Sequence, residues 1–585
     1  MEMRARLRLF KKKFASRGSE ILLIVIAALV GVVAGLVVSA MSWISKGMHS
    51  VVFGIGMADW LSATPILDPL VTMGAPVAGG VVLGALFYLL AKRKPRAIVD
   101  PIEANALYGG QMSLTSSIVV AVQNLISNGF GASVGLEAGY TQLASGIASK
   151  FGMKLKLRRA DLRILVGSGA AGAIAAAFNA PITGAFYAFE LIIGAYSIVA
   201  LAPVMVAAIV AALIARLVSS GGLTITAGDL ATFSASDFIP AVLLGALCAI
   251  VGILIMMTVA KVEEVARKSS VPIHMRPAIG GIVVGLLALV TPQVLSAGHG
   301  ALHLNLEGDV AVQTLAGLFL LKVMASAVSI GSGFRGGLFF ASLFMGALLG
   351  KAFALGVDPS LTGMLPVSVL AIVGMSALAV AIIGGPMTMT FLALEMTGNF
   401  PMTVLVLAAV ITSSVVVRST FGYSFATWRF HLRGESIRSA HDVGWIRNLT
   451  VEKLMRADIR TVRSDISLDA FKESYPIGST QRVIVVDDGD RYQGIVSVPE
   501  IHAPETDASN FSFPDFLRHK NDFLQPQMNA KQAAEIFDRS QGEALAVVDG
   551  LIGRRVIGQL SESHTLRRYS EELDRRRRDA VGETF

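Results

Sequence analysis

The sequence has few charged residues and almost no cysteine. Asp, Glu, Lys and Arg make up 16% of the 585 residues, whereas a soluble domain usually carries about 25%. Apolar residues make up 53% of the chain. The single cysteine, Cys248, excludes an intramolecular disulfide framework and any metal cluster held by cysteines alone. This composition indicates an integral membrane protein.

Apolar runs long enough to span a bilayer recur over residues 21–430. We count about ten such segments, and several are too short or too rich in glycine to cross alone. Short, tilted and half-crossing helices are therefore expected among the full spans. Basic residues concentrate in residues 1–20, before the first run, and favour a cytoplasmic amino terminus. The net charge of +8 follows from such flanking segments and requires no nucleic acid partner.

Two glycine-rich segments of similar sequence stand in the two halves of the apolar region. Residues 129–139 read GFGASVGLEAG, and residues 331–341 read GSGFRGGLFFA. Non-helical backbone at membrane depth is tolerated only where it is buried in protein or lines a cavity. Paired breaks in the two halves of a membrane protein therefore indicate a transport pathway. Glu137 in the first copy stands where the second copy has Phe339.

A second pair of related segments supports a duplicated architecture. Residues 178–190 read FNAPITGAFYAFE, and residues 383–395 read IGGPMTMTFLALE. Each copy has a proline at its fourth position, which is well placed to begin a helix. Two related helices are therefore expected after the two prolines. Glu190 and Glu395 hold corresponding positions, and we expect them to be structural or interfacial polar residues.

After the last apolar run the chain becomes rich in charged residues. Residues 482–488 and 492–497 each form a run rich in valine and isoleucine, and residues 544–549 and 556–561 repeat the pattern. Each copy is typical of a strand, an acidic turn and a second strand. A soluble α+β domain with two related modules is therefore predicted.

These motifs together resemble those of the CLC family of chloride channels and chloride/proton antiporters. GLEAG at 135–139 is similar to the glutamate-gate motif of that family, and GLFFA at 337–341 to its phenylalanine-containing motif. The segments 167–181 and 394–400 match two further family hallmarks, and Gly-Tyr-Ser at 422–424 resembles the site of the pore tyrosine. The carboxyl-terminal duplication resembles a tandem pair of CBS modules.

The resemblance implies an all-α polytopic membrane domain with an inverted internal repeat and broken, tilted helices, followed by a soluble α+β CBS pair. It also implies a homodimer in the inner membrane with both termini cytoplasmic. The expected divisions are a basic amino terminus (1–20), a membrane domain (21–430) with halves at 21–217 and 238–430, a linker (431–450), CBS modules at 451–503 and 504–567, and a charged tail (568–585).

The resemblance also implies how chloride would be held. Helix amino termini offer unsatisfied N–H groups and a partial positive charge, without a fixed cation that would bind too tightly. Gly135, Leu338 and Phe339 are expected to bind the anion through their backbone. Tyr423 is expected to add one neutral hydroxyl donor. Glu137 is expected to serve as anion gate and external proton acceptor, because a carboxylate among anion-binding amides can occupy the site of the anion.

The sequence departs from the family pattern in ways that bear on function. Leu191 stands where the antiporters have an acid that relays protons from the inside, which favours a passive channel. The retained Glu137 favours proton exchange, which we expect. The loop at 96–103 lacks the serine-bearing pore motif, so nitrate remains a second candidate cargo. Asp100 and Glu103 stand outside the expected anion site, because a carboxylate there would repel an anion.

Other classes of function fit the sequence less well. A fluoride exporter is disfavoured by the tyrosine near the pore and by the CBS pair. A membrane-anchored sensor needs one or two helices rather than a duplicated core. No catalytic or metal-ligand constellation stands out, so neither an enzyme, a metal site nor a bound cofactor is expected. An adenine nucleotide at the CBS pair has weak support, since Ser497–Glu500 matches its ribose motif imperfectly and Ser561–His564 lacks the acid.

Overall fold

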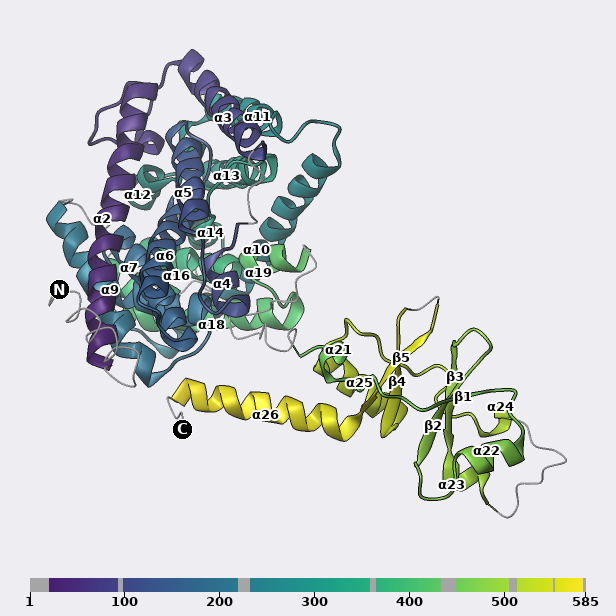
Figure 1. Ribbon diagram of the computed structural model, residues 1–585. Coiled ribbons are helices and arrows are strands. Elements are labelled where there is room, and N and C mark those ends of the chain that lie inside the picture. Colours follow the sequence, from purple (N-terminus) through teal and green to yellow (C-terminus); the bar gives the residue numbers. More distant parts are fainter. Residues whose placement is uncertain are drawn as a thin grey trace, which may run out of the picture. The chain divides into compact units, whose positions relative to one another are not determined.

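The computed structural model describes residues 20–92, 98–218, 232–357, 365–432, 449–503, 513–550 and 553–581. The chain forms two compact units that divide between Asp442 and Val443. The first unit is helical, and the second combines helices with small sheets (Figure 1). This confirms the predicted fold class. Almost all of the expected basic amino terminus and linker lies outside the described residues.

The first half of the helical unit contains both long and short helices. Among the described residues, eight helices of the chain are long and apolar enough to cross a membrane, and three shorter apolar ones accompany them. The mixture agrees with the expected full and partial spans. The elements of this half are α2 (Glu20–Phe53), η1 (Leu61–Ala63), α3 (Pro69–Ala91), α4 (Pro101–Leu107), α5 (Leu114–Gly129), α6 (Glu137–Lys154), α7 (Arg159–Phe178), α8 (Pro181–Tyr187), η2 (Ala188–Ile193) and α9 (Ile198–Val218).

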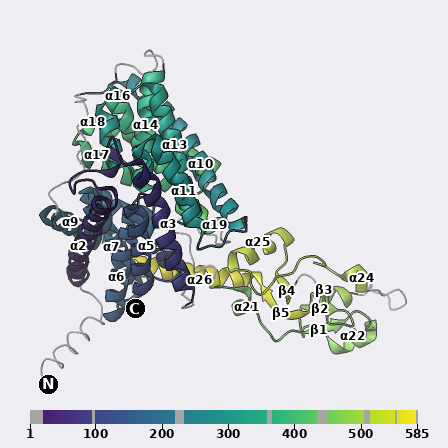
Figure 2. The same ribbon diagram turned by 90° about the horizontal axis from the view of Figure 1, so that it is seen from above.

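The second half repeats this organisation. Its glycine-rich segment precedes α14, as the first precedes α6, and a proline begins α17, as another begins α8. Figure 2 shows the purple and blue helices of the first half beside the teal and green helices of the second. The elements are η3 (Ala235–Asp237), α10 (Phe238–Lys268), α11 (Arg276–Val290), η4 (Pro292–Val294), α12 (His299–Glu307), α13 (Val312–Ser332), α14 (Phe339–Gly356), α16 (Val367–Ile383), α17 (Pro386–Thr397), α18 (Phe400–Thr420) and α19 (Phe425–Leu432).

Small residues let these helices approach closely. Gly346 of α14 faces Gly374 of α16, and a Cβ on either glycine would lie within 2.6 Å of the carbonyl oxygen of the other. Gly31 of α2 lies equally close to the backbone of Ala207 of α9. Helices packed within a bilayer gain stability from such close van der Waals contact, because lipid supplies no hydrophobic driving force between them. The packing holds the glycine-rich segments in place.

The second unit contains the two predicted strand–turn–strand modules. β1 (Thr461–Arg463) runs parallel to β2 (Arg482–Val486), which pairs antiparallel with β3 (Tyr492–Ser497). β4 (Ala544–Val548) pairs antiparallel with β5 (Val556–Ser561), and both hairpins have a register shift before their acidic turn. The helices are α21 (Val451–Leu454), α22 (Leu468–Ser474), α23 (Val498–Ile501), α24 (Phe513–Phe516), α25 (Ala530–Ser540) and α26 (Glu562–Val581).

The segment before the strands of the first module packs into the core of the second module. The segment before the strands of the second module packs against the core of the first. Val451 of α21 packs among the buried residues of the second module, including Leu545 of β4. Leu517 packs against the core of the first module, and the adjoining Arg518 forms a backbone bridge with Ile495 of β3. The two modules therefore exchange segments across the expected boundary at 503. α26 likewise continues past residue 568, where the charged tail was expected to begin.

Candidate functional site

The two glycine-rich segments meet directly. The Gly135 N–H donates to the Gly337 carbonyl oxygen at 3.0 Å, and the Gly337 N–H donates to the Gly135 carbonyl oxygen at 3.3 Å. α6 begins two residues after Gly135, at Glu137, and α14 begins two residues after Gly337, at Phe339. The bridge therefore brings the amino termini of two helices, one from each half, to one place.

The amides expected to bind an anion differ in their surroundings. The Gly135 N–H is engaged by the bridge to Gly337. Leu338 and Phe339 occupy the cap and first position of α14, where N–H groups have no partner within the helix. Both side chains are buried. Of the predicted backbone donors, Leu338 and Phe339 are therefore the better placed to face an anion.

Glu137 lies at the junction of these helices. It is the first residue of α6 and only 5% exposed. A Cβ added at Gly135 would lie 1.9 Å from Oε2 of Glu137, so the carboxylate rests against the backbone of Gly135. Among the described residues, Oε2 has no hydrogen-bond partner. An ionisable group at membrane depth is costly to bury, so Glu137 is a candidate for a functional role.

Asn124 of α5 fastens both glycine-rich segments. Its Nδ2 donates to the carbonyl oxygens of Gly135 and Arg335, each at 2.9 Å. Its Oδ1 accepts a hydrogen bond from the Gly139 N–H at 2.9 Å. Ser127, also on α5, accepts from the Arg335 N–H at 2.9 Å. Sequence reasoning missed Asn124, although a polar side chain in an apolar helix is the signal that could have found it.

Further buried polar contacts fix the first glycine-rich segment. Asn128 Nδ2 donates to the Val134 carbonyl oxygen at 2.8 Å and to Ser296 Oγ at 3.0 Å. The Ser133 N–H donates to Ser329 Oγ of α13 at 3.0 Å. Buried backbone groups that leave a helix need such partners. The start of α6 is therefore held rigidly from both halves of the membrane unit.

Glu190 and Glu395 cap each other's repeat. Glu190 accepts hydrogen bonds from the N–H groups of Thr388 and the residue before it, both at 2.9 Å, and from Thr388 Oγ1 at 2.6 Å. Glu395 accepts from the N–H of Thr183 at 2.8 Å, from the residue before it at 2.9 Å, and from Thr183 Oγ1 at 2.7 Å. The contacts support the predicted structural role. They also close the amino termini of α8 and α17 to an anion.

Tyr423 lies between α18 and α19, and Leu191 lies on another element of the first half than Glu137. The Tyr423 hydroxyl lies 3.2 Å from Nδ1 of His431, and the two rings stack with centroids 4.7 Å apart. Leu191 lies in the π-helical turn η2. Tyr187, at the end of α8, contacts the candidate site, because its ring centroid lies 6.1 Å from that of Phe339. No feature of the sequence singled out Tyr187.

The carboxylates left out of the anion site belong to α4 and its cap. Asp100 caps α4, and its Oδ1 accepts a hydrogen bond from the Ile102 N–H at 2.8 Å. Glu103 lies within α4 and is buried. Two residues after Glu103, Asn105 Nδ2 donates to the Ile192 carbonyl oxygen of η2 at 3.1 Å. Among the described residues, no group of three His, Cys, Asp or Glu side chains could hold a metal ion.

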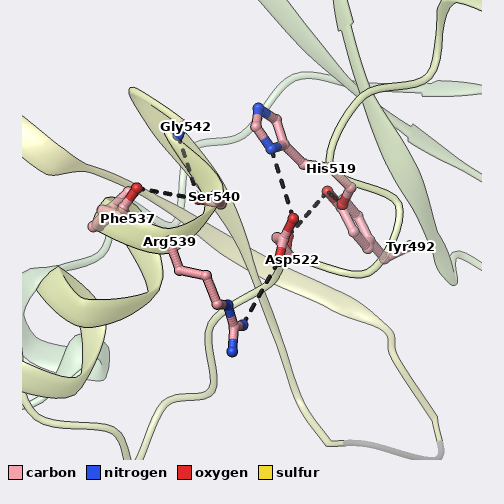
Figure 3. Close-up of polar contacts among 7 residues, drawn as sticks. All are labelled: Tyr492, His519, Asp522, Phe537, Arg539, Ser540 and Gly542. Atoms are coloured by element: carbon pink, nitrogen blue, oxygen red, sulfur yellow. Dashed lines mark hydrogen bonds and ion pairs between the residues drawn. The ribbon is translucent and has the colours of Figure 1, made fainter.

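A polar cluster joins the two modules of the second unit (Figure 3). The Tyr492 hydroxyl of β3 donates to the His519 carbonyl oxygen at 2.8 Å. The Asp522 carboxylate lies 3.9 Å from His519 Nδ1 and 3.6 Å from the Arg539 guanidinium of α25. Tyr492 is 2% exposed, and burial, with Asp522 nearby, raises the pKa of its phenol. The phenol therefore remains a donor through the neutral range.

The residues of the expected nucleotide motifs have other partners or positions. Ser497 ends β3 and precedes α23. The Glu500 carboxylate, which the motif would place on a ribose, accepts a hydrogen bond from Arg518 at 3.0 Å. In the second module Ser561 ends β5 and His564 lies in the first turn of α26. A nucleotide would have to displace Arg518 from Glu500.

Known proteins resemble this chain over most of its length. The family model described as Voltage gated chloride channel matches residues 78–418. A chloride channel protein of Ralstonia nicotianae, named as ClcB-like, is 32% identical over 351 residues, which cover 59% of this chain and 82% of the relative.

Two solved structures share the fold. A slow cyanobacterial Cl−/H+ antiporter aligns with a TM-score of 0.62 and 23% identity, over 72% of this chain and 99% of that structure. A eukaryotic CLC transporter aligns with a TM-score of 0.59 and 16% identity, over 93% of this chain and 97% of that structure. At these identities the likeness concerns the fold alone.

Proposed function

Because the chain belongs to the voltage-gated chloride channel family, we propose that it carries chloride across a membrane in exchange for protons, with Glu137 as gate and external proton acceptor. The observation that carries the proposal is the position of Glu137. Its buried carboxylate lies at the point where Gly135 and Gly337 bring two helix amino termini together. The name of the relative, a chloride channel protein, supports chloride as the cargo.

The geometry suits competition between an anion and the carboxylate. The amino termini of α6 and α14 supply partial positive charge, and the N–H groups of Leu338 and Phe339 supply donors. A deprotonated Glu137 occupies this region itself. When the carboxylate takes up a proton, its negative charge is lost and an anion can take its place. Exchange follows if the proton reaches Glu137 from one side and leaves toward the other.

Leu191 favours a second candidate, a passive chloride pathway without proton coupling. The side chain at position 191 is apolar, and the nearby Glu190 is occupied by three hydrogen bonds to α17. Neither group offers a free carboxylate for protons arriving from the inside. The passive alternative keeps Glu137 as a gate and removes only its coupling to proton movement.

The remaining parts of the proposal concern assembly and regulation. We place the protein in the inner membrane as a homodimer with one anion pathway in each subunit and with both termini cytoplasmic. The second unit is a CBS pair that serves dimerisation or stability. Adenine nucleotide is its candidate ligand, although the pairing of Glu500 with Arg518 opposes binding at the first motif.

Flux from liposomes that contain the purified protein tests the proposal. A chloride gradient should drive proton movement, and an imposed proton gradient should drive chloride uptake. Chloride flux without proton movement would select the passive pathway. Absence of chloride flux from folded protein would overturn the proposed function as a whole.

A further inference from the structure

A histidine of α19, His431, is hydrogen-bonded to the hydroxyl of Tyr423. Its Nδ1 lies 3.2 Å from that hydroxyl, and the two rings stack with centroids 4.7 Å apart. Trp428, three residues earlier in α19, stacks on the other rings of this cluster. His431 is exposed, whereas Tyr423 is half-buried. The imidazole therefore connects solvent to the tyrosine.

The tyrosine segment also borders Leu191, which stands where the antiporters have an internal proton acid. Gly384, which caps the end of α16, lies against both Leu191 and Ser424. A Cβ on this glycine would lie 3.4 Å from Leu191 Cδ2 and 3.7 Å from Ser424 Cβ. Leu191 offers no titratable group here. His431 adds one of the kind that binds and releases protons near neutral pH.

The charged side chains of the elements beside α19 leave the imidazole to the tyrosine. α16 contains none. Arg429 of α19 itself pairs with Glu263 of α10 at 3.3 Å. Within the described part of the chain, no carboxylate lies at ion-pair distance from His431. A proton on His431 therefore acts first on the bonded Tyr423 hydroxyl. The remaining charged residues of α10 and α18 are Lys261, Glu264, Arg267, Lys268 and Arg418.

The direction of the hydrogen bond depends on the protonation state of His431. A neutral imidazole that carries its hydrogen on Nε2 accepts the Tyr423 hydrogen at Nδ1. The imidazolium carries hydrogens on both nitrogens, so Nδ1 becomes the donor and the Tyr423 oxygen becomes the acceptor. The hydroxyl hydrogen then turns away from the imidazole. His431 gains one proton and one positive charge, and Tyr423 stays neutral throughout.

A buried donor next to this pair supports an anion at the same place. The Trp428 ring lies 5.4 Å from the Tyr423 ring, measured between centroids. Its Nε1 is buried and has no hydrogen-bond partner among the described residues. A buried N–H group normally has such a partner, and a small anion beside Tyr423 would supply it.

We propose that His431 binds protons that arrive from the inside, and that its protonation turns the Tyr423 hydroxyl to the transported anion. The inference rests on the proposed transport function and on the predicted role of the Tyr423 hydroxyl as a donor to the anion. Proton binding and anion binding then favour each other. His431 thereby provides, from a different element, the link to internal protons for which Leu191 has no carboxylate.

Chloride binding to the purified protein, measured by titration calorimetry at about pH 5.5 and about pH 7.5, tests this link across the range in which imidazole titrates. Glu137→Ala is the background, because protonation of the gate would also favour an anion at low pH. In this background chloride should bind about tenfold more tightly at the lower pH, the expected gain from one hydrogen bond to a charged group. His431→Gln, added to the background, should abolish this pH dependence, and so should Tyr423→Phe.

His274→Gln is the matched control for the histidine. His274 is also exposed and also lies against a tyrosine, Tyr88, with ring centroids 5.9 Å apart. The rings meet edge to face, at an interplanar angle of 63°, and the structure shows no hydrogen bond between His274 and the Tyr88 hydroxyl. This variant should keep the full pH dependence of the background.

Several results would overturn the inference. Chloride affinity in the background that does not change with pH is one, and a pH dependence that survives in His431→Gln is another. A pH dependence that survives in Tyr423→Phe would assign the effect to the charge of the imidazolium rather than to the hydroxyl. With Glu137 intact, His431→Gln should move fewer protons per chloride in liposomes, and an unchanged ratio would contradict the link to transport. Absence of chloride flux from the wild type would instead contradict the proposed function.

Discussion

Gly135 and Gly337 are joined by two backbone hydrogen bonds, yet only Gly135 lies against the gate. A Cβ at Gly135 would overlap Oε2 of Glu137 at 1.9 Å. A Cβ at Gly337 would meet nothing closer than the Ala138 side chain at 3.6 Å. The two halves of the bridge are therefore alike in hydrogen bonding and different in what a methyl group would disturb.

Gly135→Ala should displace the Glu137 carboxylate from its place at the start of α6. Chloride flux should persist while proton coupling falls, because the gate can no longer occupy the site. Gly337→Ala is the matched control, since 3.6 Å is an ordinary van der Waals separation. Parallel recording of chloride and proton flux in liposomes checks both variants. Equal coupling in the two variants would show that the carboxylate does not depend on the space at Gly135.

Asn124→Ala should destabilise the membrane unit and abolish chloride transport coupled to protons. The substitution leaves the Arg335 carbonyl oxygen and the Gly139 N–H without their side-chain partner, whereas the Gly135 carbonyl oxygen keeps its hydrogen bond from the Gly337 N–H. Each buried group left unsatisfied costs about 1–3 kcal/mol. Thermal unfolding in detergent measures the loss. Asn124→Asp keeps the acceptor for Gly139 but sets a buried carboxylate against two carbonyl oxygens, so it should lose at least as much stability as Asn124→Ala. Unchanged stability in Asn124→Ala would contradict the role of Asn124 in holding the two segments.

Glu395→Ala should lower stability without changing the ratio of protons to chloride. The carboxylate caps the amino terminus of α8, and loss of a helix cap costs about 0.5–2 kcal/mol. Glu190→Ala should do the same at α17. Thermal unfolding and coupled-flux recordings are made on the same preparations. Loss of coupling at wild-type stability in either variant would assign that glutamate to proton movement.

Tyr492→Phe should loosen the contact between the two modules of the second unit at neutral pH. The variant loses the hydrogen bond to the His519 carbonyl oxygen, which contributes about 1 kcal/mol. Hydrogen exchange of the β3 and β4 peptides in the full-length protein, corrected for intrinsic rates, reports the change. Exchange identical to the wild type would show that the bond contributes nothing.

The same tyrosine predicts a pH dependence. Its folded-state pKa is raised by burial, so its contribution to stability is complete below the ordinary tyrosine pKa of about 10 and is lost as the pH rises above that value. In Tyr492→Phe the protection of these strands should therefore decline less between pH 9 and pH 11, expressed relative to its own neutral value. An equal decline in both proteins would assign the alkaline loss to other groups.

Sequence patterns anticipated the paired glycine breaks and the related helices after the prolines, because both features are local. Glycine-rich segments cannot continue a helix favourably, and proline begins one, whatever surrounds them. The positions of Glu137, Leu338 and Phe339 at helix starts follow directly from these signals. The strands of the second unit were equally readable from their β-branched runs.

The contacts of Tyr187, Tyr423 and Asn124 could not be read in this way. Each depends on how elements distant in sequence pack together, and helix periodicity carries no information about that packing. The sequence around Tyr423 is family-like, and nothing in it indicates the contact of its hydroxyl with His431. The reciprocal capping by Glu190 and Glu395 likewise requires α8 and α17 to lie together, as the stacking of Phe186 on Phe391 shows.

Parallel recording of chloride and proton flux from liposomes that contain the wild type or Glu137→Ala tests the central claim most directly. The account predicts proton movement driven by a chloride gradient in the wild type, and chloride flux without proton movement in the variant. Proton coupling that survives in folded Glu137→Ala would contradict the assignment of Glu137 as gate and proton acceptor.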